Sequence, residues 1–123
     1  MVKESVLKDK SYAFSVKVVY CYKELAKKKE FVLSKQLLRS GTAIGALVRE
    51  AEFGQSKADF RSKLSIALKE ANETDYCLSL LKDTKYLEES KYQELDTLCK
   101  ELIRILVASV KTSSSEKCIV NSE

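Results

Sequence analysis

The sequence contains no histidine, no proline and no tryptophan, and only three of its 123 residues are glycine. Without proline, and with so little glycine, few residues interrupt a helix. Without histidine, the Glu-x-x-His pairs that hold two metals inside helical bundles cannot form. No apolar run approaches the roughly 20 residues that a membrane-spanning helix needs. These absences favour a helical protein, and we expect no metal and no cofactor.

Charges alternate along the first residues, so no signal peptide is visible and we expect a cytoplasmic protein. The four cysteines, Cys21, Cys77, Cys99 and Cys118, form no Cys-x-x-Cys pair. The first three fall within apolar helical patterns. This placement predicts reduced, buried thiols rather than zinc ligands.

Four segments carry apolar residues at helical spacing, in a chain that is 45% apolar and 33% charged. They span about 4–28, 33–53, 57–82 and 91–111. Helices of this length with short links predict an all-α, antiparallel up-down-up-down four-helix bundle over residues 1–111. We expect the remaining residues, 112–123, to form a disordered polar tail.

Each segment has one apolar stripe that should face the core. The predicted core positions are Leu7, Phe14, Val18, Cys21, Leu25, Leu33, Leu37, Gly41, Ile44, Val48, Ala51, Phe60, Leu64, Ala67, Ala71, Thr74, Leu78, Leu81, Tyr92, Leu95, Cys99, Leu102, Leu106 and Val110. The first segment carries a second apolar strip, which predicts a further surface to be covered in an oligomer. That strip consists of Tyr12, Val16, Val19, Tyr22 and Ala26.

Helix ends are also marked in the sequence. Gly54 suits the end of the second helix. Ser56 and Asp59 resemble a capping box that starts the third helix, with aspartate in place of the usual glutamate. We expect Ser90 to cap the fourth helix.

Two further stripes mix charged residues with small or apolar ones, and they flank the core stripes of the second and third helices. The stripes are Arg39, Ala43, Ala46 and Glu50, and Ile66, Glu70, Glu73 and Cys77. A guanidinium binds carboxylates through two parallel hydrogen bonds, so Arg39 is the natural partner of Glu70 or Glu73. Such a pair would fix the register of two helices or a subunit contact. A metal or catalytic role for Glu50, Glu70 and Glu73 is the weaker alternative.

Gly41 and Gly45 form a Gly-x-x-x-Gly pair inside the second helix. Each glycine costs about 1 kcal/mol relative to alanine in a helix interior. No Gly-Lys-Ser/Thr follows, so the pair is not part of a phosphate-binding loop. We expect another helix to approach closely at these glycines.

Basic charge is concentrated at the start of the chain. Residues 1–40 carry ten basic and four acidic residues, which gives them a net charge of +6. The whole chain has a net charge of +4, so the remaining residues are slightly acidic. The candidate phosphate contacts are Lys27, Lys28, Lys29 and Lys35, and such contacts would bind nucleic acid without sequence specificity. The alternative is a solvated surface whose lysines favour the negative end of a helix dipole.

Over roughly residues 4–111, and most visibly from Leu33 to Leu81, the chain resembles the four-helix-bundle proteins encoded by intervening sequences of bacterial 23S ribosomal RNA genes. That family is itself similar to the accessory variability determinant of diversity-generating retroelements. The residues that carry the resemblance are Gln36-Leu37-x-Arg39-Ser40, Thr42-x-Ile44-Gly45-Ala46, Glu50, Ser56-x-x-x-Phe60 and Ile66-Ala67-Leu68-x-Glu70-Ala71-x-Glu73-Thr74. The chain departs from the family at Leu47, usually asparagine, and at Arg49, usually small.

The resemblance implies a bundle that assembles into a pentameric ring and has no enzymatic activity. It also implies a structural or interface role for Arg39, Glu50, Glu70 and Glu73. In the retroelement branch the ring binds a reverse transcriptase and nucleic acid. Two functions therefore stay open for this chain. One is a homo-oligomer that binds RNA or DNA through a basic surface. The other is a protein-binding accessory subunit, for example of a reverse transcriptase, without nucleic-acid affinity of its own.

Overall fold

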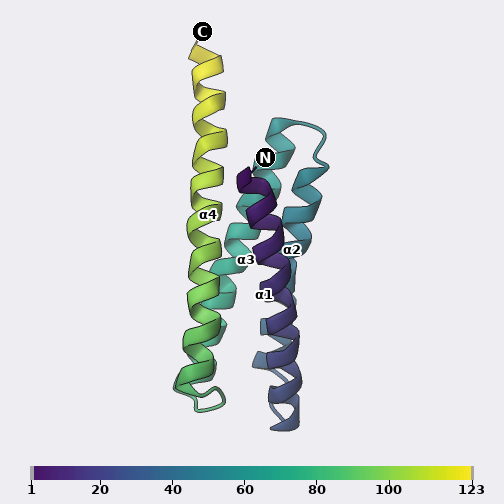
Figure 1. Cartoon of the computed structure of the whole chain (residues 1–123), viewed down its shortest axis with the longest axis vertical. Coiled ribbons are helices and arrows are strands. Elements are labelled where there is room, and N and C mark those ends of the chain that lie inside the picture. Colours follow the sequence, from purple (N-terminus) through teal and green to yellow (C-terminus); the bar gives the residue numbers. More distant parts are fainter. Residues whose placement is uncertain (1, 123) are drawn as a thin grey trace.

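A computed structural model describes the backbone of residues 2–122 and the side chains of residues 6–113. The described chain consists of four α-helices joined by short turns: α1 (Val2–Lys27), α2 (Leu33–Glu52), α3 (Lys57–Asp83) and α4 (Glu89–Ser122). The helices alternate in direction (Figure 1). The α1–α2 and α3–α4 turns lie at one end of the bundle, which we call the two-turn end. The predicted all-α up-down-up-down four-helix bundle is confirmed.

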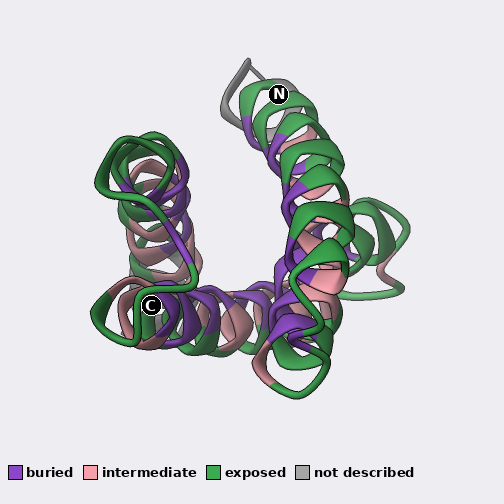
Figure 2. Cartoon of the chain, turned by 90° about the horizontal axis from the view of Figure 1, so that it is seen from below, coloured by how far each residue is buried: buried purple, intermediate pink, exposed green. Residues whose placement is uncertain are grey.

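The helices pack in chain order, α1 on α2, α2 on α3 and α3 on α4, and α4 returns to α1. Buried residues line their inward faces (Figure 2). Ion pairs bridge α1 and α4, with 3.0 Å between Lys10 Nζ and Glu101 Oε2 and 2.8 Å between Lys17 Nζ and Glu94 Oε2. Hydrogen bonds from Lys17 and Lys91 lower the pKa of Glu94. The basic first helix therefore lies against an acidic face of the last one.

The core follows the predicted stripes. Only Leu33, Phe60 and Val110 among the predicted positions are partly rather than fully buried, and they pack against the buried cluster. The small side chains of Ala67 and Ala71, both fully buried, permit the helices around α3 to approach closely.

Three cysteines lie in this core as free thiols: Cys21, Cys77 and Cys99. Burial raises the pKa of each thiol, and it raises the pKa of Cys99 to about 12. Neutral, buried thiols behave as small apolar side chains, which confirms the prediction for these three. Cys118 lies outside the described side chains.

The helix ends follow the sequence signals in part. Ser56 caps α3, since its hydroxyl accepts a hydrogen bond from the Asp59 N–H at 3.0 Å. The Asp59 carboxylate reaches back to the N–H of Gln55, one residue earlier than in a standard capping box. Gly54 follows α2 without a positive φ. Glycine suits this position because there is little room for a side chain: a Cβ would lie 3.1 Å from the Ala51 carbonyl oxygen.

One prediction on α4 is wrong. The helix begins at Glu89, so Ser90 lies inside its first turn and does not cap it. The α4 backbone continues to Ser122, and the division into a bundle over residues 1–111 and a tail over residues 112–123 stays a prediction. Residues 112–122 contain neither proline nor glycine, so nothing in them stops a helix that packing has already nucleated.

Candidate interaction surfaces

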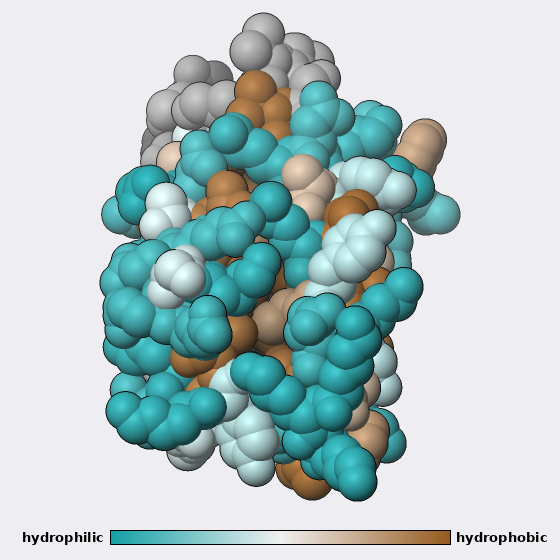
Figure 3. Space-filling view, turned by 60° about the horizontal axis from the view of Figure 1, so that its bottom comes forward, coloured by the Kyte–Doolittle hydropathy of each residue, from teal (hydrophilic) through white to brown (hydrophobic). Residues whose placement is uncertain are grey.

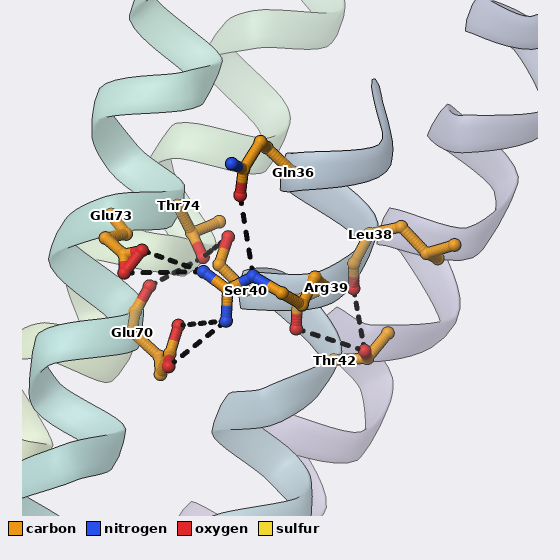
Figure 4. A network of polar contacts seen from close by, with 8 residues as sticks. All are labelled: Gln36, Leu38, Arg39, Ser40, Thr42, Glu70, Glu73 and Thr74. Atoms are coloured by element: carbon orange, nitrogen blue, oxygen red, sulfur yellow. Dashed lines mark hydrogen bonds and ion pairs between the residues drawn. The ribbon is translucent and has the colours of Figure 1, made fainter. Parts of the chain in front are cut away.

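Arg39 on α2 faces two carboxylates of α3 (Figure 4). Its Nη1 lies 3.2 Å from Glu70 Oε1, and its Nη2 lies 2.8 Å from Glu73 Oε2. The hydrogen bonds to Glu70, helped by attraction to both carboxylates, raise the pKa of Arg39 despite some desolvation. The predicted pairing is confirmed, and Arg39 binds both partners because residues three apart are neighbours on a helix surface.

Two buried hydroxyls lie beside this ion pair. Ser40 Oγ and Thr74 Oγ1 are 2.8 Å apart, and Thr74 also contacts the Glu70 carbonyl oxygen at 2.8 Å. Both residues are buried, so each needs a hydrogen-bond partner within the bundle. The Ser40–Thr74 contact therefore continues the Arg39 network into the core and holds α2 and α3 in register. Sequence patterns did not predict it.

Replacing Arg39 by alanine is expected to lower the free energy of unfolding by about 1 kcal/mol, since two partly exposed ion pairs are lost. Urea denaturation at low and at high salt measures this loss, which salt should reduce. Arg104→Ala, at an exposed position of α4, is the matched control and should change little. If the urea midpoint of Arg39→Ala equals that of the wild type, the Arg39 network does not stabilise the protein.

Gly41 and Gly45 face α1. A Cβ at Gly41 would lie 2.9 Å from both Val18 γ-carbons. A Cβ at Gly45 would lie 3.2 Å from Ser15 Oγ and 3.3 Å from the Ser11 carbonyl oxygen. The predicted close approach is confirmed, with α1 as the neighbouring helix.

A groove of about 840 Å³ opens beside this contact, between α1 and α2. Its lining includes the small residues Ser15, Gly45 and Ala46. It also includes the rings of Tyr12 and Phe53, which are 61% and 76% exposed. We call it the α1–α2 groove. A hollow between two exposed aromatic rings can accept side chains of another molecule.

The second apolar strip of α1 meets this groove at Tyr12, which is one of its lining residues. Tyr12 and Val16 are exposed, whereas Val19, Tyr22 and Ala26 are half-buried. The prediction of spare apolar surface on the first helix is therefore confirmed for Tyr12 and Val16.

The candidate phosphate contacts all lie at the two-turn end, where hydrophilic side chains cover most of the visible surface (Figure 3). Lys27 Nζ is 3.3 Å from Glu24 Oε2, and Lys28 Nζ donates to the Tyr86 carbonyl oxygen at 2.8 Å. Lys29 and Lys35 are exposed, and within the described residues neither has a carboxylate partner. Among the described residues, only Lys27 of the four is paired with a carboxylate, and the charges of Lys28, Lys29 and Lys35 are uncompensated.

Both turns at this end use lysine where a helix usually ends with glycine. Lys29 and Lys85 have φ angles of 64° and 71°. After α1, the N–H of Glu30 donates to the Leu25 carbonyl and that of Lys29 to the Ala26 carbonyl. At the end of α3, the N–H of Tyr86 donates to the Leu81 carbonyl and that of Lys85 to the Lys82 carbonyl. These are Schellman motifs, which favour glycine because a left-handed conformation costs other residues about 1–2 kcal/mol.

Glu30 holds the start of α2. Its buried carboxylate accepts hydrogen bonds from the backbone N–H groups of Val32, Leu33 and Ser34, at 3.2, 3.0 and 2.6 Å. Burial by itself would raise the pKa of Glu30, but these three donors outweigh it and lower the pKa. An anion at a helix N-terminus is also favoured by the helix dipole.

A third polar cluster joins α3 to α4. Lys100 Nζ lies 3.3 Å from Asp75 Oδ1 and 2.7 Å from Asp96 Oδ2. The hydrogen bond to Asp96 and the attraction of both carboxylates raise the pKa of Lys100 to about 12. Asp96 is buried in this contact.

The three carboxylates of the alternative metal or catalytic site, Glu50, Glu70 and Glu73, are paired with cations. Glu70 and Glu73 bind Arg39, and Glu50 Oε1 lies 3.3 Å from Lys63 Nζ. Within the described part of the chain, no three His, Cys, Asp or Glu residues lie together as a metal site would require. Glu50, Glu70 and Glu73 therefore act as partners of Lys63 and Arg39.

A family model described as 23S rRNA-intervening sequence protein matches residues 3–108. The chain belongs to this family. It is also similar to a crystal structure from Bacteroides thetaiotaomicron, described as a protein with unknown function from the S23 ribosomal protein family. The two are 52% identical, with 89% of this chain and 98% of that chain covered and a TM-score of 0.87. No curated protein matches the chain.

Leu47 and Arg49, the two positions at which the sequence is expected to depart from the family pattern, both lie on α2. Leu47 is half-buried and packs against the core, so an apolar residue suits the position. Arg49 is exposed and lines the α1–α2 groove. Among the described residues, no helix is long and apolar enough to cross a membrane.

Proposed function

We propose that this member of the family is a non-enzymatic homo-oligomer that binds nucleic-acid phosphates through its two-turn end. The observation that carries the proposal is the pair of left-handed lysines, Lys29 and Lys85, at the same end of the bundle as Lys28 and Lys35. Strained backbone persists where the surrounding structure holds it and commonly accompanies function. At this end the strained positions carry positive charge.

The Lys29→Gly variant tests the proposal, because stability and binding should change in opposite directions. Glycine adopts the left-handed conformation without the steric strain of a side chain, so the variant is expected to raise the free energy of unfolding by about 0.5–1 kcal/mol. Loss of the ammonium should weaken binding to a structured RNA at low salt. Fluorescence anisotropy and urea denaturation measure the two quantities.

Lys69→Gln is the control for binding, since it removes the same charge from an exposed position in the middle of α3. A Lys29→Gly protein that is more stable and binds RNA as well as the wild type would contradict the proposal. Absence of RNA binding by the wild type at low salt would instead favour the accessory subunit that acts only through protein contacts.

The self-association is supported by the exposed rings of Tyr12 and Phe53 and by the exposed Val16. Together they give α1 and α2 an apolar face that a second copy can cover. The number of copies, five, rests on the family resemblance alone. A ring of subunits would also repeat the two-turn end around one axis, so that weak phosphate contacts of several copies act together.

Light scattering over micromolar concentrations tests the assembly, with a single mass of several copies expected. Tyr12→Lys should reduce this mass, and Tyr76→Lys, at an equally exposed tyrosine of α3, should not. A monomeric wild-type protein would rule out the assembly.

A further inference from the structure

A second groove, of about 530 Å³, lies at the two-turn end and is lined by α1, the α3–α4 turn and the start of α4. Its lining includes the rings of Tyr20 and Tyr86, which are 63% and 38% exposed. The buried side chains of Cys21, Leu25 and Leu87 form its apolar floor. We call it the tyrosine groove. Exposed tyrosine rings beside an apolar floor favour a flat, partly apolar partner.

Cations surround these rings. Lys28 and Lys91 line the groove, and Lys23 Nζ lies 5.5 Å from the centre of the Tyr20 ring. Two carboxylates also line it. Glu24 is paired with Lys27 at 3.3 Å, whereas Glu88 has no cation partner within the described residues. Lys91 Nζ is itself paired with Glu94 Oε1 at 3.3 Å, so the cations near the rings without a carboxylate partner in the described residues are Lys23 and Lys28. These two charges favour an anionic partner, and Glu88 opposes it.

The groove is held in shape by the contact between the two turns. Lys28 Nζ donates to the carbonyl oxygen of Tyr86 at 2.8 Å, which ties the Tyr86 backbone to the end of α1. The Schellman motif at Lys85 fixes the same turn from the α3 side through the hydrogen bond from the Tyr86 N–H to the Leu81 carbonyl. A ring placed in this way loses little freedom when a partner binds.

We propose that the tyrosine groove binds single-stranded nucleic acid, with bases stacked on Tyr20 and Tyr86 and phosphates near Lys23, Lys28 and Lys91. The inference rests on the proposed function and narrows it to one class of nucleic acid. A duplex keeps its bases stacked inside and presents phosphates to the lysines, but it has no free base for the rings. A single strand uses both the rings and the lysines.

Fluorescence anisotropy with oligo(U) RNA, oligo(dT) DNA and a duplex RNA of equal charge tests this inference on the full chain. The wild type should bind the two single strands more tightly than the duplex. Tyr20→Leu and Tyr86→Leu should each weaken single-strand binding by about fivefold or more, because each removes a stacking surface. The duplex affinity should not change. Tyr20→Phe should bind as the wild type does, since the stacking ring remains.

Two further variants sharpen the test. Tyr76→Leu, at a tyrosine of α3 that is outside the groove, should leave all affinities unchanged. Glu88→Gln should strengthen binding of the single strands, because the opposing charge is removed. Tighter binding of oligo(U) than of oligo(dT) would support stacking together with contacts to the 2′-hydroxyl, and equal affinities would support stacking alone.

The outcomes separate this inference from the proposed function. If single strands and duplex bind equally well, and the tyrosine variants bind as the wild type does, the tyrosine groove is ruled out while phosphate binding remains. If no nucleic acid binds at low salt, both proposals fail.

Discussion

Replacing Glu30 by alanine is expected to lower the free energy of unfolding by about 2–3 kcal/mol. The buried carboxylate accepts three backbone hydrogen bonds at the start of α2. Their loss would leave the buried N–H of Ser34 and the partly buried N–H groups of Val32 and Leu33 without this acceptor. The charge also favours the positive end of the α2 dipole. Urea denaturation at pH 7 measures the effect. Glu89→Ala, at the exposed start of α4, is the matched control and should cost only a few tenths of a kcal/mol.

The pH dependence identifies the carboxylate charge as the cause. The pKa of Glu30 is lowered in the folded state from an ordinary value of 4.5. Its contribution to stability should therefore be complete above about pH 4.5 and be lost as the pH falls through the lowered folded-state pKa. Glu30→Gln keeps an acceptor oxygen without the charge, so the stability gap between it and the wild type should narrow below pH 4.5. A gap of constant size from pH 7 to pH 3 would contradict this account.

Replacing Gly41 by alanine is expected to destabilise the protein by about 1–2 kcal/mol, although alanine is the better helix former. The gain in helix propensity is about 1 kcal/mol. The new Cβ would lie 2.9 Å from both γ-carbons of Val18, which is fully buried and has no room to move. Overpacking typically costs about 1–3 kcal/mol. Because Val18 is fully buried, we expect the upper part of this range, about 2–3 kcal/mol, which leaves about 1–2 kcal/mol after the gain in helix propensity.

Gly45→Ala supplies the comparison for Gly41→Ala. There the closest atom is Ser15 Oγ, at 3.2 Å, so the clash is milder and the net change should be near zero. In a double-mutant cycle, Val18→Ala should offset part of the cost of Gly41→Ala. Equal stability of the Gly41→Ala and wild-type proteins would mean that α1 does not approach α2 as closely as described.

The periodicity of the sequence is sufficient to predict the four-helix fold and the ion pairs of Arg39, but not the Ser40–Thr74 contact beside them. Residues three or four apart lie on the same face of a helix, so the apolar spacing predicts directly that residues such as Leu37, Ile44 and Leu78 lie in the core. Arg39, Glu70 and Glu73 could be placed on facing stripes for the same reason. The partner of the glycine pair could not be assigned, because the spacing within α2 does not say which helix lies against it.

Other features of the two-turn end follow no common sequence pattern. Glutamate is not a usual N-cap residue, and Glu30 reaches the α2 backbone from before the helix begins. Lysine is not a usual residue for a left-handed helix end, so Lys29 and Lys85 carry no recognisable signal. Tyr20 and Tyr86 come together only because the α3–α4 turn folds back against α1, which is a tertiary contact.

Salt dependence of RNA binding tests the central claim most directly. The association constant of a structured RNA is measured from low to physiological salt for the wild type and for the triple variant Lys27→Gln/Lys29→Gln/Lys35→Gln. Each phosphate contact contributes about 0.7–0.9 to the slope of log K against log salt. The account predicts binding that falls with salt and a slope reduced by about two in the variant. No binding at low salt, or the same slope in both proteins, would contradict it.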